Sequence, residues 1–177
     1  QPYTYDVDAN GIRWPGYWFG TQPPAGMTIV APTGVISWTP TESQLGLHTI
    51  TVNASNAYGT DTQIFDIDVA GVAPVITSTA VITATVNQPY TYDVEATGIP
   101  APTYALTVSP AGMTINATTG VIDWTPDETQ LGYNQVSIDA TNSEGTYTQS
   151  FYVDVAGVAP VIISTPVTEA TVNQPYT

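Results

Sequence analysis

The chain of 177 residues carries 15 acidic side chains against a single Arg, and its formal net charge of −14 excludes nucleic acid and anionic membranes as partners. It has no Cys and no Lys, which excludes disulfides, thiolate metal sites and Lys-based crosslinks. With 42% hydrophobic residues, 9% charged residues and no apolar run near the roughly 18 residues of a membrane helix, the composition predicts a folded chain without membrane insertion.

The sequence repeats itself with a period of 86 to 87 residues. The tetrapeptide Gln-Pro-Tyr-Thr begins at Gln1, Gln88 and Gln174, and a shift of 86 residues places Gly26-Met27-Thr28-Ile29 on Gly112-Met113-Thr114-Ile115. Self-similarity at one period indicates a tandem array of one module. We predict a repeat at residues 1–72 that lacks its first strand, a complete repeat at 73–158, and the first strand of a further repeat at 159–177.

Strand patterns follow one another along both copies, and helix patterns are nearly absent. Apolar and polar residues alternate with a period of two, as in half-buried strands, and Gly- and Pro-containing turns separate them. In chain order, the inward positions are Tyr3, Tyr5, Val7; Ile50, Val52, Ala54; Phe65, Ile67, Val69; the alternating stretch Tyr90 to Ala96; Val136, Ile138, Ala140; and Tyr147, Gln149, Phe151, Val153, Val155. Seven short strands per module at this spacing predict an all-β sandwich.

The first strand of a module is predicted at Ala73–Ser78 together with Val81–Val86. Pro74 and the break near Thr79-Ala80 are typical of an edge strand that switches sheets. The first copy begins at Gln1 without this strand, whereas Ala159–Val172 repeats it with no module following.

Two explanations fit these ends. In the first, the sequence is a two-period window on a longer array, cut at the same point of the repeat at both ends. In the second, 177 residues form a complete subunit, and the strand at Ala159–Val172 completes the next subunit by strand addition. Both predict a filament or stalk held by self-association or by neighbouring repeats.

The stretch from Pro110 to Pro126 reads PAGMTINATTGVIDWTP and is followed by Leu131-Gly132, Ala140-Thr141-Asn142 and Gly145. These elements recur in order in the first copy, and the sequence resembles the Putative Ig domain family, which is cadherin-like and occurs in large bacterial and archaeal surface proteins. The resemblance covers both copies nearly end to end. It implies tandem Ig-like (cadherin-like) β-sandwich repeats of a secreted protein, used for length, adhesion or display, and no catalytic residues.

Catalytic arrangements are not predicted. A nucleophile needs a neighbouring base, and the one histidine, His48, is replaced by Asn134 in the second copy. Paired carboxylates are not repeated either, since Asp123 corresponds to Ser37. We therefore predict a non-enzymatic protein without a required cofactor.

Calcium between domains is one ligand hypothesis. Asp66 and Asp68 in one copy and Asp154 in the other are expected to point outward near the junction that follows each module, as in a cadherin-like array. The alternative is a solvated acidic face.

Glycosylation is a second hypothesis. Asn53-Ala54-Ser55 and Asn116-Ala117-Thr118 are acceptor sequons. The Asn53 side chain is expected to point outward from its strand, and Asn116 is expected in a turn. Both are therefore predicted to be accessible.

The first copy departs from the repeat at its aromatic residues. It reads Pro15-Gly16-Tyr17-Trp18-Phe19 where the second copy reads Pro102-Thr103-Tyr104-Ala105-Leu106, so Trp18 is expected to point outward, and Trp14 lies beside Arg13. Exposed tryptophans beside an arginine are typical of a protein interface. Packing back over their own core and stacking on sugar rings are the alternatives. The motif tryptophans Trp38 and Trp124 are instead predicted to be core residues.

The function predicted from the sequence is mechanical. We expect an extracellular protein of the cell surface that builds a stalk, fibre, pilus-like filament or sheath from modules joined by Ala-Gly-Val-Ala-Pro linkers. The alternative is a carbohydrate-binding or adhesin module of a larger secreted protein.

Overall fold

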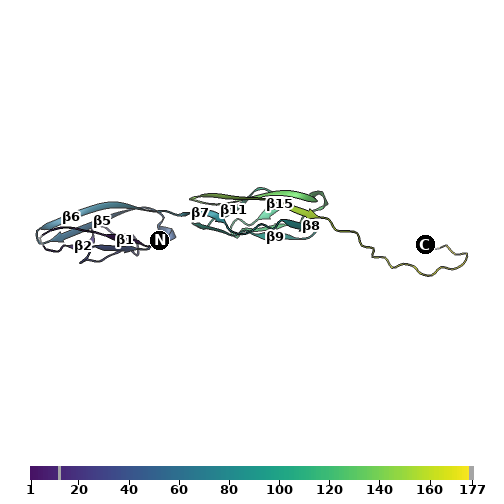
Figure 1. Cartoon of the computed structure of the whole chain (residues 1–177), viewed down its shortest axis with the longest axis horizontal. Helices are drawn as coiled ribbons and strands as arrows, with labels where there is room; N and C mark the ends of the chain where they lie inside the picture. Colours follow the sequence, from purple (N-terminus) through teal and green to yellow (C-terminus); the bar gives the residue numbers. More distant parts are fainter. Residues whose placement is uncertain (12, 176–177) are drawn as a thin grey trace.

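The computed structural model describes residues 1–11 and 13–175 and is built almost entirely of strands. Two sandwich modules follow one another along the chain, and a segment without strands leaves the far end of the second (Figure 1). We call residues 1–69 the first module, residues 72–156 the second module and residues 157–175 the tail. Tyr176 and Thr177, which complete the last Gln-Pro-Tyr-Thr, lie outside the described residues.

The first module has two three-stranded sheets, with strand orders β1-β4-β3 and β2-β5-β6. All of their pairings are antiparallel. The elements are β1 (Tyr3–Asp6), β2 (Gly16–Phe19), β3 (Thr28–Ile29), β4 (Val35–Trp38), the 3₁₀ turn η1 (Glu42–Gln44), β5 (Gly46–Asn56) and β6 (Gly59–Val69).

The second module repeats these sheets as β12-β13-β9 and β11-β14-β15 and adds strands to them. β7 pairs with β10, and β8 pairs in parallel with the outer edge of β15. The elements are β7 (Val72–Ile76), β8 (Thr83–Thr85), β9 (Tyr90–Asp93), β10 (Ala96–Ile99), β11 (Thr103–Val108), β12 (Thr114–Ile115), β13 (Val121–Trp124), the 3₁₀ turn η2 (Glu128–Gln130), β14 (Gly132–Asn142) and β15 (Gly145–Ala156).

The longest element of each module is a hairpin whose two strands run nearly its full length. β5 pairs with β6 from Gly46 to Asn56, and the Asn56 side-chain oxygen accepts a hydrogen bond from the Tyr58 N–H at 2.9 Å, which stabilises the turn. The equivalent bond in the second module joins the Asn142 side-chain oxygen to the Glu144 N–H at 2.9 Å.

The Thr-Gly-Val element of the motif is a tight turn that packs against the opposite strand. Gly34 has φ 78° and Gly120 has φ 79°, in the left-handed region that favours glycine. A Cβ on Gly120 would also lie 2.3 Å from the Val94 carbonyl oxygen. Both conditions require glycine, so the repeated Gly is explained by local geometry.

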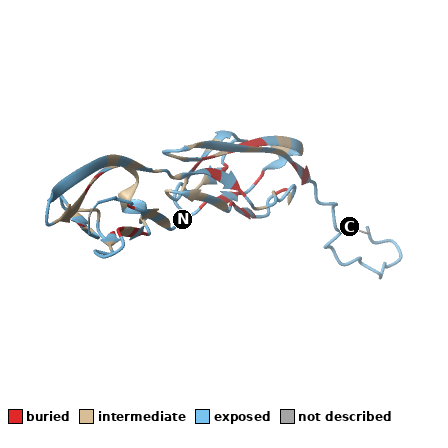
Figure 2. Ribbon diagram, turned by 60° about the vertical axis from the view of Figure 1, so that its left-hand side comes forward, coloured by how far each residue is buried: buried red, intermediate tan, exposed pale blue. Residues whose placement is uncertain are grey.

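Each module has its own core, and the buried residues lie between its two sheets (Figure 2). Ile36 and Ile122 are fully buried at equivalent positions. Trp38 and Trp124 are also buried, and the indole N–H of each donates to a backbone carbonyl at 3.2 Å, that of Ala25 and Ala111 respectively. Tying the indole nitrogen in this way lets a large aromatic side chain enter the core without an unsatisfied donor.

Three features differ from the sequence prediction. The stretch Tyr90 to Ala96 is not one strand, because β9 pairs with β13 while β10 crosses to pair with β7. Tyr147 is exposed, since it lies toward the hairpin end of β15, although it continues the apolar alternation of that strand. The linker is Ala70-Gly71 alone, since Val72 already belongs to β7.

No helix among the described residues is long and apolar enough to cross a membrane.

Candidate functional site

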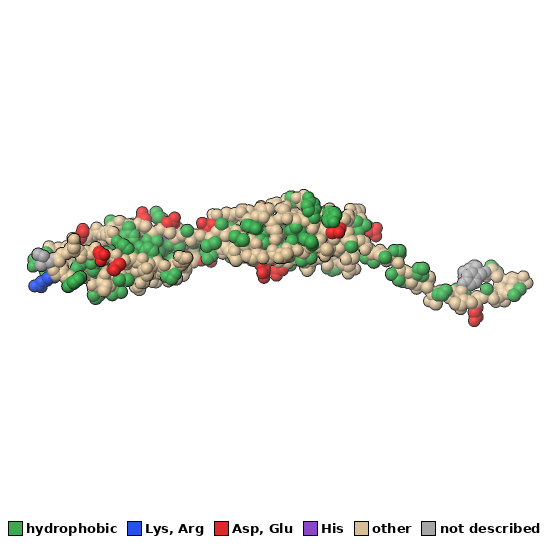
Figure 3. Space-filling model, in the orientation of Figure 1, with side chains coloured by type: hydrophobic (Ala, Val, Ile, Leu, Met, Phe, Trp, Pro, Cys, Tyr) green, Lys and Arg blue, Asp and Glu red, His purple; other side chains and the backbone are tan. Residues whose placement is uncertain are grey.

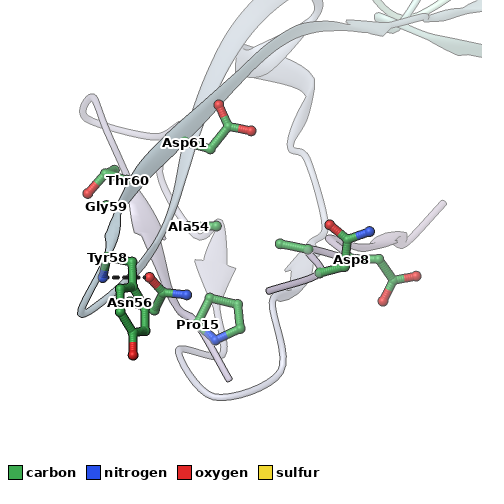
Figure 4. Close-up of a pocket in the computed structure, with 10 residues that line it drawn as sticks. Asp8, Pro15, Ala54, Asn56, Tyr58, Gly59, Thr60 and Asp61 are labelled. Carbon is green, nitrogen blue, oxygen red and sulfur yellow. Dashed lines mark hydrogen bonds between the residues drawn. The ribbon is translucent and has the colours of Figure 1, made fainter. Parts of the chain in front are cut away.

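The first module has an open cavity between the tip of its long hairpin and the segment that follows β1. The cavity encloses about 770 Å³. Figure 4 shows Asp8 on one side of the opening and the hairpin residues Asn56, Tyr58 and Gly59 on the other. A second cavity of about 310 Å³ continues from it along Tyr5, Val7, Val52 and Gln63. Together they form a groove over the edge of the first module, which we call the strand groove.

The residues that line the strand groove have counterparts in the second module, where β7 and the residue Ser78 occupy the same place. Asn142, the counterpart of Asn56, donates from its side-chain nitrogen to the carbonyl oxygens of Val72 at 2.9 Å and Pro100 at 2.8 Å. Gln149, the counterpart of Gln63, donates to the Ser78 carbonyl oxygen at 3.0 Å. The strand groove is therefore the position of a strand that the described part of the first module does not supply.

Two equivalent tyrosines show the effect of this difference on hydrogen bonding. The Tyr92 hydroxyl lies 2.8 Å from the Ser78 hydroxyl and donates to the Gln149 side-chain oxygen at 3.0 Å. The Tyr5 hydroxyl bonds with the side chain of Gln63 at 3.1 to 3.2 Å in more exposed surroundings.

Titration of a third tyrosine follows burial as well. Burial, and secondarily the neighbouring Tyr92, raise the pKa of Tyr90 to about 12. Its hydroxyl donates to the Val81 carbonyl oxygen at 2.7 Å, in the segment between β7 and β8. Partial burial, and then Tyr5, raise the pKa of the equivalent Tyr3 as well.

The aromatic residues singled out from the sequence lie at the outer end of the first module. Trp14 is 94% exposed, and it lines a shallow depression with Arg13 beside the strand groove. Trp18 on β2 pairs with Asn53 and is 42% exposed, so its side chain faces outward as expected. The structure therefore brings Arg13 and Trp14 together and leaves Trp18 on the outer face of the sheet.

The two sequon asparagines differ in their surroundings. Asn116 is exposed in a turn, and its carbonyl oxygen accepts from the Thr118 N–H at 2.9 Å and the Thr119 N–H at 3.1 Å. Asn53 is half-buried on β5, where its carbonyl oxygen accepts from the Thr62 hydroxyl at 2.8 Å. Attachment of a glycan at either residue stays a prediction, and Asn116 is the more accessible of the two.

The acidic residues near the junctions do not form a cluster. Asp66 accepts a hydrogen bond from the Thr49 hydroxyl at 2.6 Å, Asp68 lies opposite Leu47, and Asp154 lies opposite Tyr133 on the other module. Across residues 1–11 and 13–175, no three His, Cys, Asp or Glu side chains come close enough to hold a metal ion. The calcium hypothesis therefore has no ligand set to rest on.

His48 has a structural role that its counterpart reproduces. Its ring nitrogen lies 2.7 Å from the Gln44 carbonyl oxygen, and the Asn134 side-chain nitrogen donates to the equivalent Gln130 carbonyl at 2.7 Å. The ring also packs edge-on against Trp38, with centroids 5.2 Å apart. Its position is explained by this bond and this contact.

The junction between the modules was missed by sequence reasoning as an ordered site. β6 ends at Val69 and β7 begins at Val72, so two residues connect them. A Cβ added to Gly71 would lie 2.3 Å from the Ile99 carbonyl oxygen, which shows how closely the linker packs on the second module. The only signal in the sequence is that Ala-Gly-Val-Ala-Pro recurs unchanged at residues 70–74 and 156–160.

A family model described as Putative Ig domain matches residues 1–70 and 73–156. The two matched segments correspond to the two modules, and their border falls at the linker. A search of curated protein sequences finds no match.

Solved structures of Ig domains share the architecture. Titin domains A168–A170 align over 89% of this chain and 61% of theirs, with 13% identity and a TM-score of 0.62. Titin domains Z1Z2, solved in complex with telethonin, align over 89% of both chains, with 17% identity and a TM-score of 0.58. An endo-fucoidan hydrolase of glycoside hydrolase family 107 aligns with 18% identity and a TM-score of 0.44 over 90% of this chain. The chain spans 18% to 27% of the length of the glycosidase chains that it matches.

Proposed function

The chain belongs to the Putative Ig domain family, and from this premise we propose that it is a non-catalytic spacer of an extracellular stalk, fibre or sheath. In this role it holds successive Ig-like modules at a fixed distance and orientation. The proposal rests on the fold and on the packing of the junction.

The single observation that carries the proposal is the closed linker. Asn142 bonds to the Val72 carbonyl, and Gly71 packs against Ile99 and Glu144, so the chain is tied to the second module immediately after leaving the first. Two residues without slack restrict the swing between neighbours far more than a flexible linker does. A load applied along the chain is then carried from one long hairpin to the next.

The arrangement also sets a length scale. The hairpin strand β14 has 11 residues, which corresponds to roughly 37 Å at the rise of an antiparallel strand. Two modules in line therefore give an extended unit, as seen in Figure 1. Charged residues are few and almost all acidic on the face shown in Figure 3, which is compatible with a soluble surface polymer.

The proposal is tested by measuring the distance between equivalent points of the two modules. Because the chain has no Cys, spin labels can be placed uniquely at Glu42→Cys and Glu128→Cys, on the exposed turns η1 and η2. We expect a single narrow distance distribution in a double electron–electron resonance experiment. The matched control carries Gly-Ser-Gly-Ser inserted between Ala70 and Gly71 and is expected to give a broad distribution. A distribution equally broad without the insertion contradicts the spacer role.

A further inference from the structure

The outer edge of the long hairpin is covered in one module and open in the other. In the second module β8 pairs in parallel with β15, placing Thr83, Ala84 and Thr85 opposite residues 154–156. Among the described residues of the first module, no strand pairs with the equivalent edge of β6. An open edge with unpaired backbone groups is a template for another strand.

The core beneath this edge is shaped for a further strand. Val153 and Val155 are buried, whereas their counterparts Ile67 and Val69 are only half-buried. Ala140 is fully buried, whereas Ala54 lies in the wall of the strand groove. The β6 edge and the strand groove thus form one continuous acceptor that matches the path of β7 and β8.

The tail has the sequence that this acceptor fits. Residues 159–162 repeat Ala-Pro-Val-Ile of β7, and Ser164 corresponds to Ser78, whose hydroxyl bonds to Tyr92 and to the Glu95 N–H. Ala170 and Val172 correspond to Ala84 and Val86. In the second module Ile76 and Val86 are each 7% exposed, whereas in the tail Ile162 is 89% and Val172 is 86% exposed. Figure 3 shows these apolar side chains spaced along the tail, away from either core.

We propose that the acceptor of the first module binds residues 158–172 from the tail of a second copy of this chain, as a strand parallel to β6. This inference rests on the proposed spacer function and names the partner that extends it. The tail cannot serve its own first module, because only Gly157 separates Val158 from the far end of the second module (Figure 1). The tail of another copy reaches the acceptor directly.

The resulting assembly is a linear filament. Head-to-tail contacts of this kind use two different surfaces and extend without closing when no rotation closes a ring. The segment Ala156-Gly157-Val158 repeats the linker Ala70-Gly71-Val72, so each junction between copies has the geometry of the junction within one copy. Trp14 and Arg13 then lie at the outer end of the acceptor module, where the preceding copy arrives.

The donated strand ends before the last four residues. In the acceptor, Gln1–Thr4 already occupy the positions that follow the missing strand, and Tyr3 and Thr4 pair with Trp38 and Ser37 of β4. The donor therefore contributes up to Asn173. A chain that ends at Asn173 is expected to assemble as well as the full chain does.

Adjacent isoleucines of the tail provide the closing test. Ile162 corresponds to the buried Ile76, and Ile163 corresponds to the exposed Thr77, although both are exposed in the tail. Light scattering after size exclusion and electron microscopy of the full chain should show filaments whose length grows with concentration. Ile162→Asp should weaken association by at least about 10- to 150-fold, the factor for losing one buried isoleucine. Ile163→Asp should assemble normally.

A peptide of residues 158–173, added to the full chain, should cap the acceptor and shorten the filaments. A monomeric full chain at all concentrations, or equal assembly of the Ile162→Asp and Ile163→Asp variants, overturns the proposal. Neither result changes the distance between Glu42 and Glu128 labels within one copy, so failure of strand donation is distinguishable from failure of the spacer function.

Discussion

The two modules share one sequence pattern, and they differ most where the second has β7 and β8 and the first has an open groove. Far from that edge they are equivalent, since Ile36 and Ile122 are both fully buried. At the edge they diverge, because Tyr90 and Tyr92 are buried whereas Tyr3 and Tyr5 are half-buried. The same residue types thus have different burial according to one neighbouring strand.

This difference separates what a module needs to fold from what it needs to be complete. Both modules retain two facing sheets, a long hairpin and a core tryptophan that donates to a backbone carbonyl. The strand made of β7 and β8 adds a lid over one edge of that core. The first module is thus a sandwich whose remaining stability depends on a strand from elsewhere in the chain or from another chain.

The largest effect should come from supplying the strand covalently. Placing residues 73–87 directly ahead of Gln1 should raise the free energy of unfolding of the first module by about 3–6 kcal/mol, because two apolar side chains each contribute roughly 1.5–3 kcal/mol when buried. Chemical denaturation should then show the first-module transition moving toward that of the second.

The control for this graft carries Asp at the grafted position equivalent to Ile76, which is buried in the second module. It should remove most of the gain. An unmoved first-module transition in the uncontrolled graft would show that the groove is not a strand site. The same graft should also abolish assembly, since it fills the acceptor.

A smaller effect should distinguish the two equivalent tyrosine hydroxyls. Tyr92→Phe should destabilise the second module by about 1 kcal/mol, because its hydroxyl joins Ser78 and Gln149 in partly buried surroundings. Tyr5→Phe should cost the first module clearly less, since its bond to Gln63 is exposed. Denaturation of both variants measures this, and equal costs would contradict the role assigned to the missing strand.

Much of the fold was predictable because it repeats. The alternation at Val136, Ile138 and Ala140 predicted three residues that are fully buried, and the Pro74 break predicted a first strand divided between two partners. Periodicity reports burial directly, so these inferences needed only neighbouring residues.

The remainder depends on contacts that sequence does not report. Asn142 reads as a turn residue, but its side chain reaches the Val72 carbonyl across 70 residues and closes the linker. Trp14 lies in a loop without periodicity, so the sequence offered no measure of its 94% exposure. The groove itself is defined by a strand that is absent from the described first module, and only superposition on the second module shows its shape.

The smallest expected effect concerns pH and again separates the modules. The Tyr90 hydroxyl has a pKa of about 12 in the folded state, raised first by burial, whereas an unfolded chain has the ordinary value near 10. The folded state then retains a proton that the unfolded state loses, so this stabilisation is complete below pH 10 and declines as the pH rises from 10 to 12. Denaturation at rising pH should show the second module losing stability in this window, and Tyr90→Phe should remove that loss. Tyr3→Phe should change the profile of the first module less, since Tyr3 is only half-buried. A slope that persists in the Tyr90→Phe variant would assign the effect to another group. The strand covers Tyr90 and supplies the Val81 carbonyl that its hydroxyl binds, so grafting the strand onto the first module should give Tyr3 the same pH dependence.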